Sequence, residues 1–135
     1  TPLAHVSELR LIAGVDRAVY ERLAPHVCAL PAPTPGNLNF ASRPLWMSLD
    51  PRITEAMAER LWREGRARYH SLDEVAQALR DEGVEPVDLS AWATSSRYLV
   101  LDAEIEVDGV AFAYASLLER DPRGLRVRAR VRGAL

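Results

Sequence analysis

The chain has 135 residues, 48% of them hydrophobic, which is enough for one hydrophobic core or for two small ones that share a boundary. Its formal net charge is −2, with 17 arginines and no lysine, so the chain as a whole has no positive field that attracts nucleic acid or an anionic membrane. Cys28 is the single cysteine, which excludes an internal disulfide and a cysteine-based zinc site, and no apolar run approaches the roughly 18 residues of a membrane span.

The first part of the chain has the pattern of two short helices followed by a stiff connector. Residues 7–13 predict a short helical segment with its leucines and isoleucine on one side, and Gly14 ends it. Asp16 is placed to cap a second helix over residues 17–24, which carries an apolar stripe and ends before a proline. Residues 31–36 contain three prolines and a glycine, and they predict an extended connector.

Residues 37–79 have the layout of a helix-hairpin-helix or SAM-like module, a type that holds nucleic-acid phosphates in some proteins and docks other proteins elsewhere. Ser42 is expected to cap a short helix that has Pro44 in its first turn, where the missing N–H costs nothing. Residues 49–53 predict a turn. An amphipathic helix from about residue 54 to 66 is expected to follow it.

A second capped helix completes this module. Ser71–Glu74 has the sequence of a capping box, in which the serine and the glutamate each satisfy the other's free N–H group. Residues 83–93 predict a linker with one turn of helix around Trp92. The inner faces of the module's helices are expected to comprise Met57, Ala58, Leu61, Trp62, Val75, Ala76 and Leu79.

Beyond residue 97 the hydrophobic period changes to two, which predicts strands. Apolar and acidic residues alternate over 99–107, and Asp108–Gly109 is a strong signal for a hairpin with a type I′ turn. Residues 110–118 are apolar on both faces, as in a central strand, and 121–124 predict a second turn. The last strand is expected to alternate Leu125, Val127, Ala129 and Val131 with Arg126, Arg128, Arg130 and Arg132.

These patterns predict an α+β fold with two domains. A helical SAM-like or helix-hairpin-helix-like module occupies residues 1–94, and a three-stranded antiparallel meander occupies residues 95–135. Three strands in isolation are only marginally stable. The meander therefore needs a covering layer, from a helix of this chain or from one outside it, and we expect it to belong to a larger sheet or assembly.

At this point the sequence resembles a known family, the minor pseudopilin K of type II secretion, also called general secretion pathway protein K, in its C-terminal portion. The Asn37–Ala41 segment is similar to that family's Asn-Val-Asn-Thr-Ala motif, although Phe40 stands in place of the usual threonine, and Asp50–Arg52 replaces a more usual Pro-Gly. The segments that carry the resemblance are Ser7–Asp16, Tyr20–Pro25, Ala29–Pro31, Asn37–Ala41, Tyr69–Glu74 and Ser95–Tyr98.

The resemblance implies a non-catalytic minor pseudopilin with a helical domain inserted into a pilin-like fold. Such a protein joins the minor pseudopilins I and J at the tip of a short periplasmic pseudopilus that supports protein export across the outer membrane. Because the first residue is Thr1, we expect a longer parent chain, held in the inner membrane by an N-terminal helix. The resemblance also implies calcium, but it assigns no calcium ligand to any residue of this chain.

The alternative is a helix-hairpin-helix module that binds nucleic acid, which would present free N–H groups to a phosphate. Its candidate turn contains Asp50 and Pro51, an acid that repels phosphate and a residue that lacks an N–H. The other candidate turn, Ala13–Asp16, also ends in an acid. Residues 1–95 contain 10 arginines and 13 acidic residues, a net charge of −3. The arginines between residues 60 and 68 are interleaved with Glu55, Glu59 and Glu64, which predicts a solvated, ion-paired face.

The remaining polar residues favour structural roles. His5, His26 and His70 lack the spacing of metal ligands, and Ser95–Ser96 lacks the context of a hydrolase nucleophile. We therefore assign no catalytic residue and no cofactor-binding residue. Trp46, Trp62 and Trp92 are interpreted as packing residues, and Asn37 and Asn39 as residues that hold turn backbone.

Four acids, Asp102, Glu104, Glu106 and Asp108, lie along the first predicted strand and at the start of the turn after it. Side chains that alternate along a strand lie about 7 Å apart, which is too far for a single calcium ion. We expect this row and the arginine row of residues 126–132 to share a sheet face or edge. They form a charge-balanced solvent face or, alternatively, an electrostatic docking surface for a partner pilin subunit.

Overall fold

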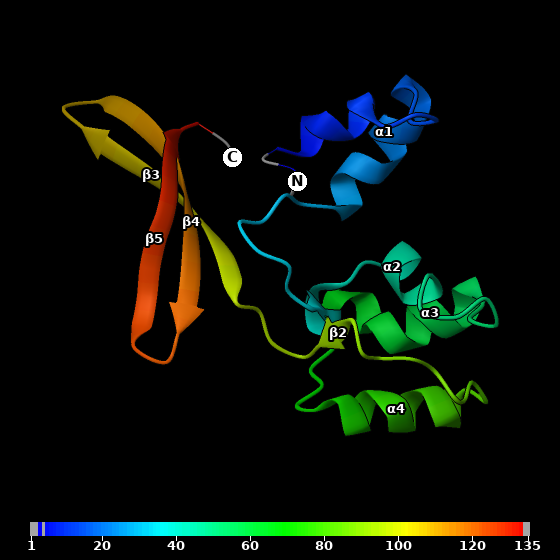
Figure 1. The fold of residues 1–135 in the computed structure, drawn as a ribbon. Coiled ribbons are helices and arrows are strands. Elements are labelled where there is room, and N and C mark those ends of the chain that lie inside the picture. Colours follow the sequence, from blue (N-terminus) through cyan, green and yellow to red (C-terminus); the bar gives the residue numbers. More distant parts are fainter. Residues whose placement is uncertain (1–2, 4, 134–135) are drawn as a thin grey trace. The chain divides into compact units, whose positions relative to one another are not determined.

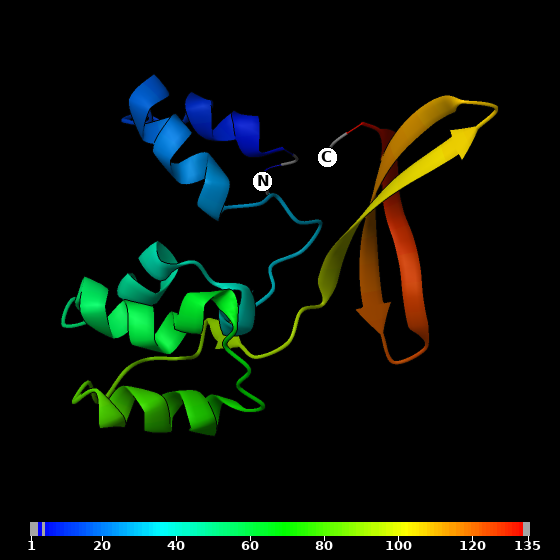
Figure 2. The ribbon, with the colours of Figure 1, turned by 180° about the vertical axis from the view of Figure 1, so that it is seen from behind.

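The computed structural model describes residue 3 and residues 5–133, and it combines helices with a three-stranded antiparallel sheet (Figures 1 and 2). The chain divides into two compact units, Thr1–Ser95 and Ser96–Leu135. We call them the helical unit and the strand unit.

The helical unit begins with a 3-10 helix, η1 (Val6–Leu11), followed by α1 (Arg17–Leu23) and by a second 3-10 helix, η2 (Ala24–His26). Asp16 caps α1 as predicted, because its carboxylate accepts a hydrogen bond of 2.8 Å from the Val19 N–H. The short helical segment before Gly14 is also confirmed, but as a 3-10 helix that His5 caps.

The connector leads into β1 (Gly36–Asn37), which pairs in parallel with β2 (Trp92–Ala93). The expected helical turn around Trp92 is therefore wrong. The indole ring of Trp92 packs on Gly36 so closely that a Cβ there would lie 2.8 Å from Cζ3. This contact explains why the segment is extended, and it depends on two parts of the chain that are far apart in sequence.

Replacing Gly36 by alanine should destabilise the helical unit by about 1–3 kcal/mol, because the added methyl group forces the Trp92 ring away from β1. Urea unfolding followed by tryptophan fluorescence measures this loss. The comparison variant is Gly83→Ala, where a Cβ meets nothing within 4 Å but the backbone φ is +75°. That variant is destabilised by backbone strain, which is absent at Gly36, and it touches no tryptophan, so only Gly36→Ala should also change the native tryptophan spectrum.

After the 3-10 helix η3 (Leu38–Phe40), the module contains α2 (Arg43–Met47), α3 (Glu55–Trp62) and α4 (Leu72–Asp81). Figures 1 and 2 both show α3 between α2 and α4. The predicted helix over 54–66 is too long. Arg63 and Glu64 take left-handed backbone angles, and a 3-10 turn, η4 (Arg63–Gly65), follows α3.

The predicted caps of this module are half correct. The Ser71 hydroxyl accepts a hydrogen bond from the Glu74 N–H, but the Glu74 carboxylate accepts one from the His70 N–H (2.8 Å) rather than from that of Ser71. Ser42 lies at the N-cap position of α2 without a capping hydrogen bond, because its hydroxyl pairs with the His26 ring at 3.0 Å.

The core of the helical unit gathers around Trp46, which is fully buried and lies 5.7 Å from the Tyr69 ring, measured between centroids. Trp62 and Trp92 pack against this core while remaining partly exposed. The buried members of the core are Leu38, Ala41, Trp46, Ile53, Ala58, Leu61, Ala67, Tyr69, Val75, Leu79 and Val84.

The strand unit is the predicted meander, with β4 (Val110–Asp121) between β3 (Tyr98–Val107) and β5 (Gly124–Arg132). The β3–β4 turn is confirmed at Asp108 and Gly109, whose φ angles of 51° and 77° are the positive values that a type I′ turn requires.

A bulge interrupts the alternation of β5. Val127 pairs with Leu118 whereas Ala129 pairs with Leu117, so Arg128 is an extra residue between them. Because directly paired residues share a face, Val127 and Ala129 lie on opposite faces. The predictions of one apolar row and one arginine row along β5, the latter sharing a face with the β3 acids, are therefore wrong.

The register gives the sheet two distinct faces. One, the apolar face, carries Leu99, Leu101, Ala103, Ile105, Val107, Val110, Phe112, Tyr114, Leu118, Leu125 and Val127. The other, the acidic face, carries Asp102, Glu104 and Glu106 beside Ala111, Ala113 and Ala115. Six side chains of the apolar face are about half exposed, namely Leu101, Ile105, Val107, Val110, Leu125 and Val127.

Candidate functional site

The Asn37–Ala41 segment is organised around Asn39, whose side chain joins three parts of the helical unit. Its Nδ2 group donates hydrogen bonds of 2.9 Å to the carbonyl oxygens of Tyr69 and Thr94, and its Oδ1 atom accepts one of 2.7 Å from the Tyr69 N–H. The Asn37 Oδ1 atom accepts from the Asn39 N–H at 3.0 Å. The predicted backbone-holding role of both asparagines is confirmed, and both N–H groups of the Asn39 amide are used in it.

The turn proposed for phosphate contact is closed by an internal ion pair. The Asp50 carboxylate accepts hydrogen bonds from the Nε and Nη2 atoms of Arg52 (2.8 and 2.9 Å) and from the Arg52 N–H (2.9 Å). The same guanidinium donates to the carbonyl oxygens of Glu85 and Pro86, each at 2.9 Å. Arg52 therefore ties this turn to the loop after α4, and a phosphate would have to displace it.

These hydrogen bonds, first those from the Arg52 side chain and then the one from its N–H, lower the pKa of Asp50 from 3.8 to about 2. Because the folded-state pKa is depressed, the pair's contribution to stability is present above about pH 4 and is lost as the pH falls toward about 2. An NMR titration of the Asp50 carboxyl should show this midpoint, and Arg52→Gln should raise it toward 3.8. A wild-type midpoint near 3.8 would contradict the pairing.

The arginines near α3 are engaged by acids from other elements. Arg60 forms an ion pair with Glu82 at the end of α4 (2.5 Å), and Arg43 of α2 pairs with Glu59 at 3.0 Å. Arg63 lies over the Tyr69 ring, 5.1 Å from its centroid. The prediction of an ion-paired face is confirmed: Arg66 pairs with Glu64 in the turn after α3 at 3.5 Å, whereas the pairs of Arg60 and Arg43 cross between elements.

The strand unit contains a charged cluster that the sequence patterns did not indicate. The Glu119 side chain is 5% exposed, and it forms ion pairs of 2.5 Å with both Arg97 and Arg128. The Tyr98 hydroxyl lies 3.5 Å from the same carboxylate. The Arg97 hydrogen bonds are the main cause of the lowered pKa of Glu119. The bulge in β5 brings Arg128 to this carboxylate, a position that no local sequence signal reveals.

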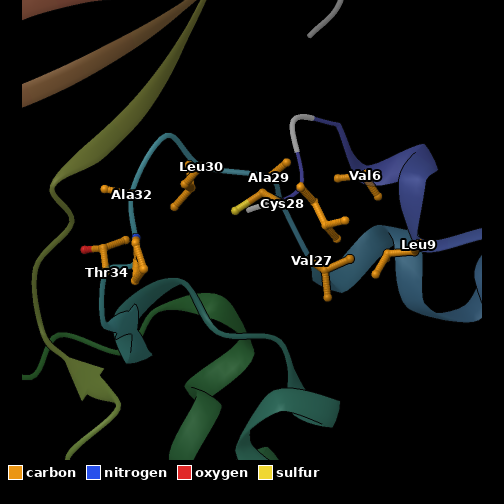
Figure 3. Close-up of a pocket in the computed structure, with 10 residues that line it drawn as sticks. Val6, Leu9, Val27, Cys28, Ala29, Leu30, Ala32 and Thr34 are labelled. Atoms are coloured by element: carbon orange, nitrogen blue, oxygen red, sulfur yellow. The ribbon is translucent and has the colours of Figure 1, made fainter. Parts of the chain in front are cut away.

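An apolar pocket of ≈ 320 Å³ lies in the N-terminal part of the helical unit (Figure 3). η1 contributes Val6 and Leu9 to its wall, and the segment that follows η2 contributes Val27, Cys28 and Leu30, among others. The described residues of its lining include no acid, histidine or arginine. The pocket therefore offers apolar contact but no acid–base pair.

Each of the three histidines makes a side-chain hydrogen bond to another side chain of the helical unit. His5 pairs with Ser7 (2.8 Å), His26 with Ser42 (3.0 Å) and His70 with Glu74 (3.4 Å). Ser96 uses its carbonyl oxygen to accept a hydrogen bond from Arg120, and Ser95 is exposed.

The structure assigns no calcium ligand among the residues that it describes. Within them, no group of three or more His, Cys, Asp or Glu side chains lies close enough together to hold a metal ion. Asp102, Glu104 and Glu106 point from one face of a single strand and do not converge on one point. The same part of the chain contains no helix long and apolar enough to cross a membrane.

Comparisons with known proteins point to one family. Residues 1–32 match the family model described as "Type II secretion system (T2SS), protein K". The chain is 34% identical over 132 residues to the type II secretion system protein K of Pseudomonas aeruginosa, covering 95% of this chain and 38% of that protein. It is 69% identical over 29 residues to the protein of the same name from Klebsiella pneumoniae, covering 22% of this chain and 9% of that protein.

A solved structure is similar over nearly the whole fold. It is the crystal structure of the GspK-GspI-GspJ complex from the type 2 secretion system of enterotoxigenic Escherichia coli. The TM-score is 0.67 and the identity 26%, over 98% of this chain and 49% of the matched chain. The chain thus spans less than half the length of the relatives that it matches.

Proposed function

Because the chain belongs to the type II secretion system protein K family, we propose that it is part of a minor pseudopilin in the tip complex of the secretion pseudopilus. One observation carries this proposal. The fold is similar, over 98% of the chain, to a K protein whose structure was determined in a complex with I and J. The partners are then the minor pseudopilins I and J. The location is the periplasm, with the parent protein anchored in the inner membrane by a helix outside this chain.

The two parts have different roles in this proposal. Residues 1–94 form a SAM-like helical module that enlarges the head of the subunit, and its bulk prevents another subunit from packing above it. Residues 95–135 are the final strands of a pilin-like sheet. The exposed apolar face supports this role, because side chains such as Leu101, Ile105 and Val127 are about half exposed and suit the covering helix of a pilin.

The proposed role is non-catalytic. The polar groups of the helical unit are used in its own framework, as with Asn39 and the Asp50–Arg52 pair. The buried carboxylate of Glu119 is likewise neutralised by two arginines. The subunit acts by shape and surface contact instead of by bond-making.

The test is gel filtration with soluble I and J from the same genome, added to this chain and to a longer soluble form of the same protein. We expect the longer form to co-elute with both partners as one complex. Three separately folded proteins that elute apart would contradict the proposal.

Nucleic-acid binding, the alternative, is not supported by the comparisons. It also requires a phosphate to bind the turn at Asp50, where the carboxylate already accepts two hydrogen bonds from the Arg52 guanidinium. A gel-retardation assay with duplex DNA at low salt distinguishes the two functions, because electrostatic DNA binding is strongest there. A salt-dependent shift would favour the alternative, and we expect none.

A further inference from the structure

The bulge in β5 determines on which face of the sheet the last arginines lie. Because a bulge adds one residue to a strand, it reverses the alternation of the side chains that follow it. Arg130 pairs with Ser116 and therefore lies on the apolar face. Arg132 pairs with Tyr114 and lies there too. Two contacts agree with this register. Arg130 donates to the Ser116 hydroxyl at 3.1 Å, and Arg132 lies 5.2 Å from the centroid of the Phe112 ring.

The charged side chains of the apolar face all have one sign. They are Arg120 of β4 and Arg130 and Arg132 of β5, whereas β3 contributes only aliphatic side chains to this face. Every acid of the three strands lies on the opposite face. Arg120 donates to the Ser96 carbonyl oxygen at 2.7 Å. Neither Arg130 nor Arg132 has a carboxylate partner in the described part of the chain. The apolar face therefore carries unneutralised positive charge along its β5 side.

This combination restricts what can cover the apolar face. Half-exposed side chains such as Leu101, Ile105 and Val127 favour an apolar layer. A second copy stacked through the same face would bring arginines toward arginines with no acid between them. An element that carries carboxylates on the side over β5 neutralises Arg130 and Arg132, while its apolar residues pack on the rest of the face.

We propose that an amphipathic helix of the same protein, from the part outside this chain, covers the apolar face and carries acidic side chains along the flank that lies over β5. The proposal rests on the proposed role of the strands in a pilin-like sheet, and it adds the charge and the orientation of the covering helix. Arg130 and Arg132 are two positions apart on a strand, about 7 Å. Two acids one turn apart on a helix, with about 6 Å between their Cβ atoms, match that spacing.

The same protein is the source of the helix for two reasons. A three-stranded sheet alone is only marginally stable, so it needs a permanent cover rather than a transient partner. The K chain of the matched complex is about twice as long as the part that this chain covers, which is 49%. The remainder of such a protein is long enough to supply a helix.

Two synthetic amphipathic peptides test the proposal on this chain. They share one apolar stripe, and one flank carries two glutamates one turn apart in the first peptide and two lysines in the second. NMR titration measures both the Kd and the place of contact. We expect the glutamate peptide to bind about tenfold more tightly at low salt, because two attractive contacts replace two repulsive ones. High salt should reduce this difference, and the shifted amides should belong to β3, β4 and β5.

Reversing the two arginines should reverse the preference. Arg130→Glu with Arg132→Glu should bind the lysine peptide more tightly, whereas Arg130→Lys with Arg132→Lys should keep the wild-type order. The matched control, Arg22→Glu with Arg123→Glu, makes the same change at two exposed sites outside the three strands and should also keep it. Circular dichroism confirms that each variant is folded. Where the glutamate variant does not fold, Arg130→Gln with Arg132→Gln replaces it and should abolish the preference.

A longer soluble form of the protein identifies the source of the helix. Its own helix should occupy the face, so the glutamate peptide should bind this form at least tenfold more weakly than it binds the chain. Equal affinity of the two peptides for the chain, no binding of either, or undiminished binding to the longer form would each overturn the proposal. None of these measurements contains I or J, so a failure of the proposed complex with them is a separate result.

Discussion

Replacing Asn39 by leucine should destabilise the helical unit by about 3 kcal/mol, because three backbone groups lose their hydrogen-bond partner at once. Leucine has the same branched arrangement of side-chain heavy atoms as asparagine, so the change removes hydrogen bonds without leaving a cavity. The groups left without a partner are the N–H and C=O of Tyr69 and the C=O of Thr94. These groups come from the loop before α4 and from the segment that follows β2.

Urea unfolding followed by tryptophan fluorescence measures this effect on the helical unit alone, since Trp46, Trp62 and Trp92 all lie within it. Asn39→Asp should also destabilise the unit, because a carboxylate accepts from the Tyr69 N–H but cannot donate to the two carbonyl oxygens. The matched control is the neighbouring Phe40→Ser, whose side chain is 80% exposed and whose loss should change little. Equal stability of the Asn39 and Phe40 variants would show that Asn39 does not hold the module together.

Replacing Glu119 by glutamine should strongly destabilise the strand unit at neutral pH. The change leaves the guanidinium groups of Arg97 and Arg128 beside a buried neutral amide, in place of the carboxylate that neutralises both. Amide hydrogen exchange of β4 measures the loss, and we expect faster exchange throughout that strand. Glu104→Gln is the matched control, because it makes the same chemical change at an exposed site of the same sheet.

The pH dependence of the strand unit gives a second readout of Glu119. Its folded-state pKa is lowered, mainly by the hydrogen bonds from Arg97. Its contribution to folding stability is therefore fully present when the pH is above the ordinary pKa of a glutamate. That contribution is lost as the pH falls through the folded-state pKa. Acid should therefore speed exchange in β4 of the wild type relative to neutral pH, after correction for intrinsic exchange rates. Glu119→Gln should remove most of this dependence, and an unchanged pH profile in the variant would contradict the ion-pair account.

The local features of the fold could be predicted from the sequence because short-range chemistry determines them. Asp16 caps α1 through a residue three positions away, and Asp108–Gly109 supplies the positive φ angles of its own turn. β3 follows from a period of two, and β4 follows from an apolar run between two turns. None of these features requires knowledge of a distant partner.

The errors occur where a distant contact decides the local structure. Trp92 is extended because it packs on Gly36, more than fifty residues earlier. The helix over α3 ends early although Arg63 and Glu64 favour helix, and the Arg63 side chain then lies over Tyr69. The bulge at Arg128 follows from no pattern in β5. It is the feature that divides the arginines between the two sheet faces.

The candidate sites likewise combine features that the local sequence predicts with features that depend on distant contacts. Asp50 argues against phosphate binding from the sequence alone, whereas the hydrogen bonds from Arg52 to Glu85 and Pro86 depend on the folded chain. The Glu119 cluster was missed for the same reason, because Arg97, Glu119 and Arg128 meet only through the register of the sheet.

Amide hydrogen exchange of this chain, measured alone and with soluble I and J, tests the central claim most directly, because it locates contact with each subunit. If the chain works by recognising neighbouring pseudopilins, exchange should slow on its surface when I and J are added, and duplex DNA should leave the turn at residues 49–53 unchanged. The account is contradicted if I and J leave the exchange unaltered along the whole chain. It is also contradicted if DNA slows exchange at that turn.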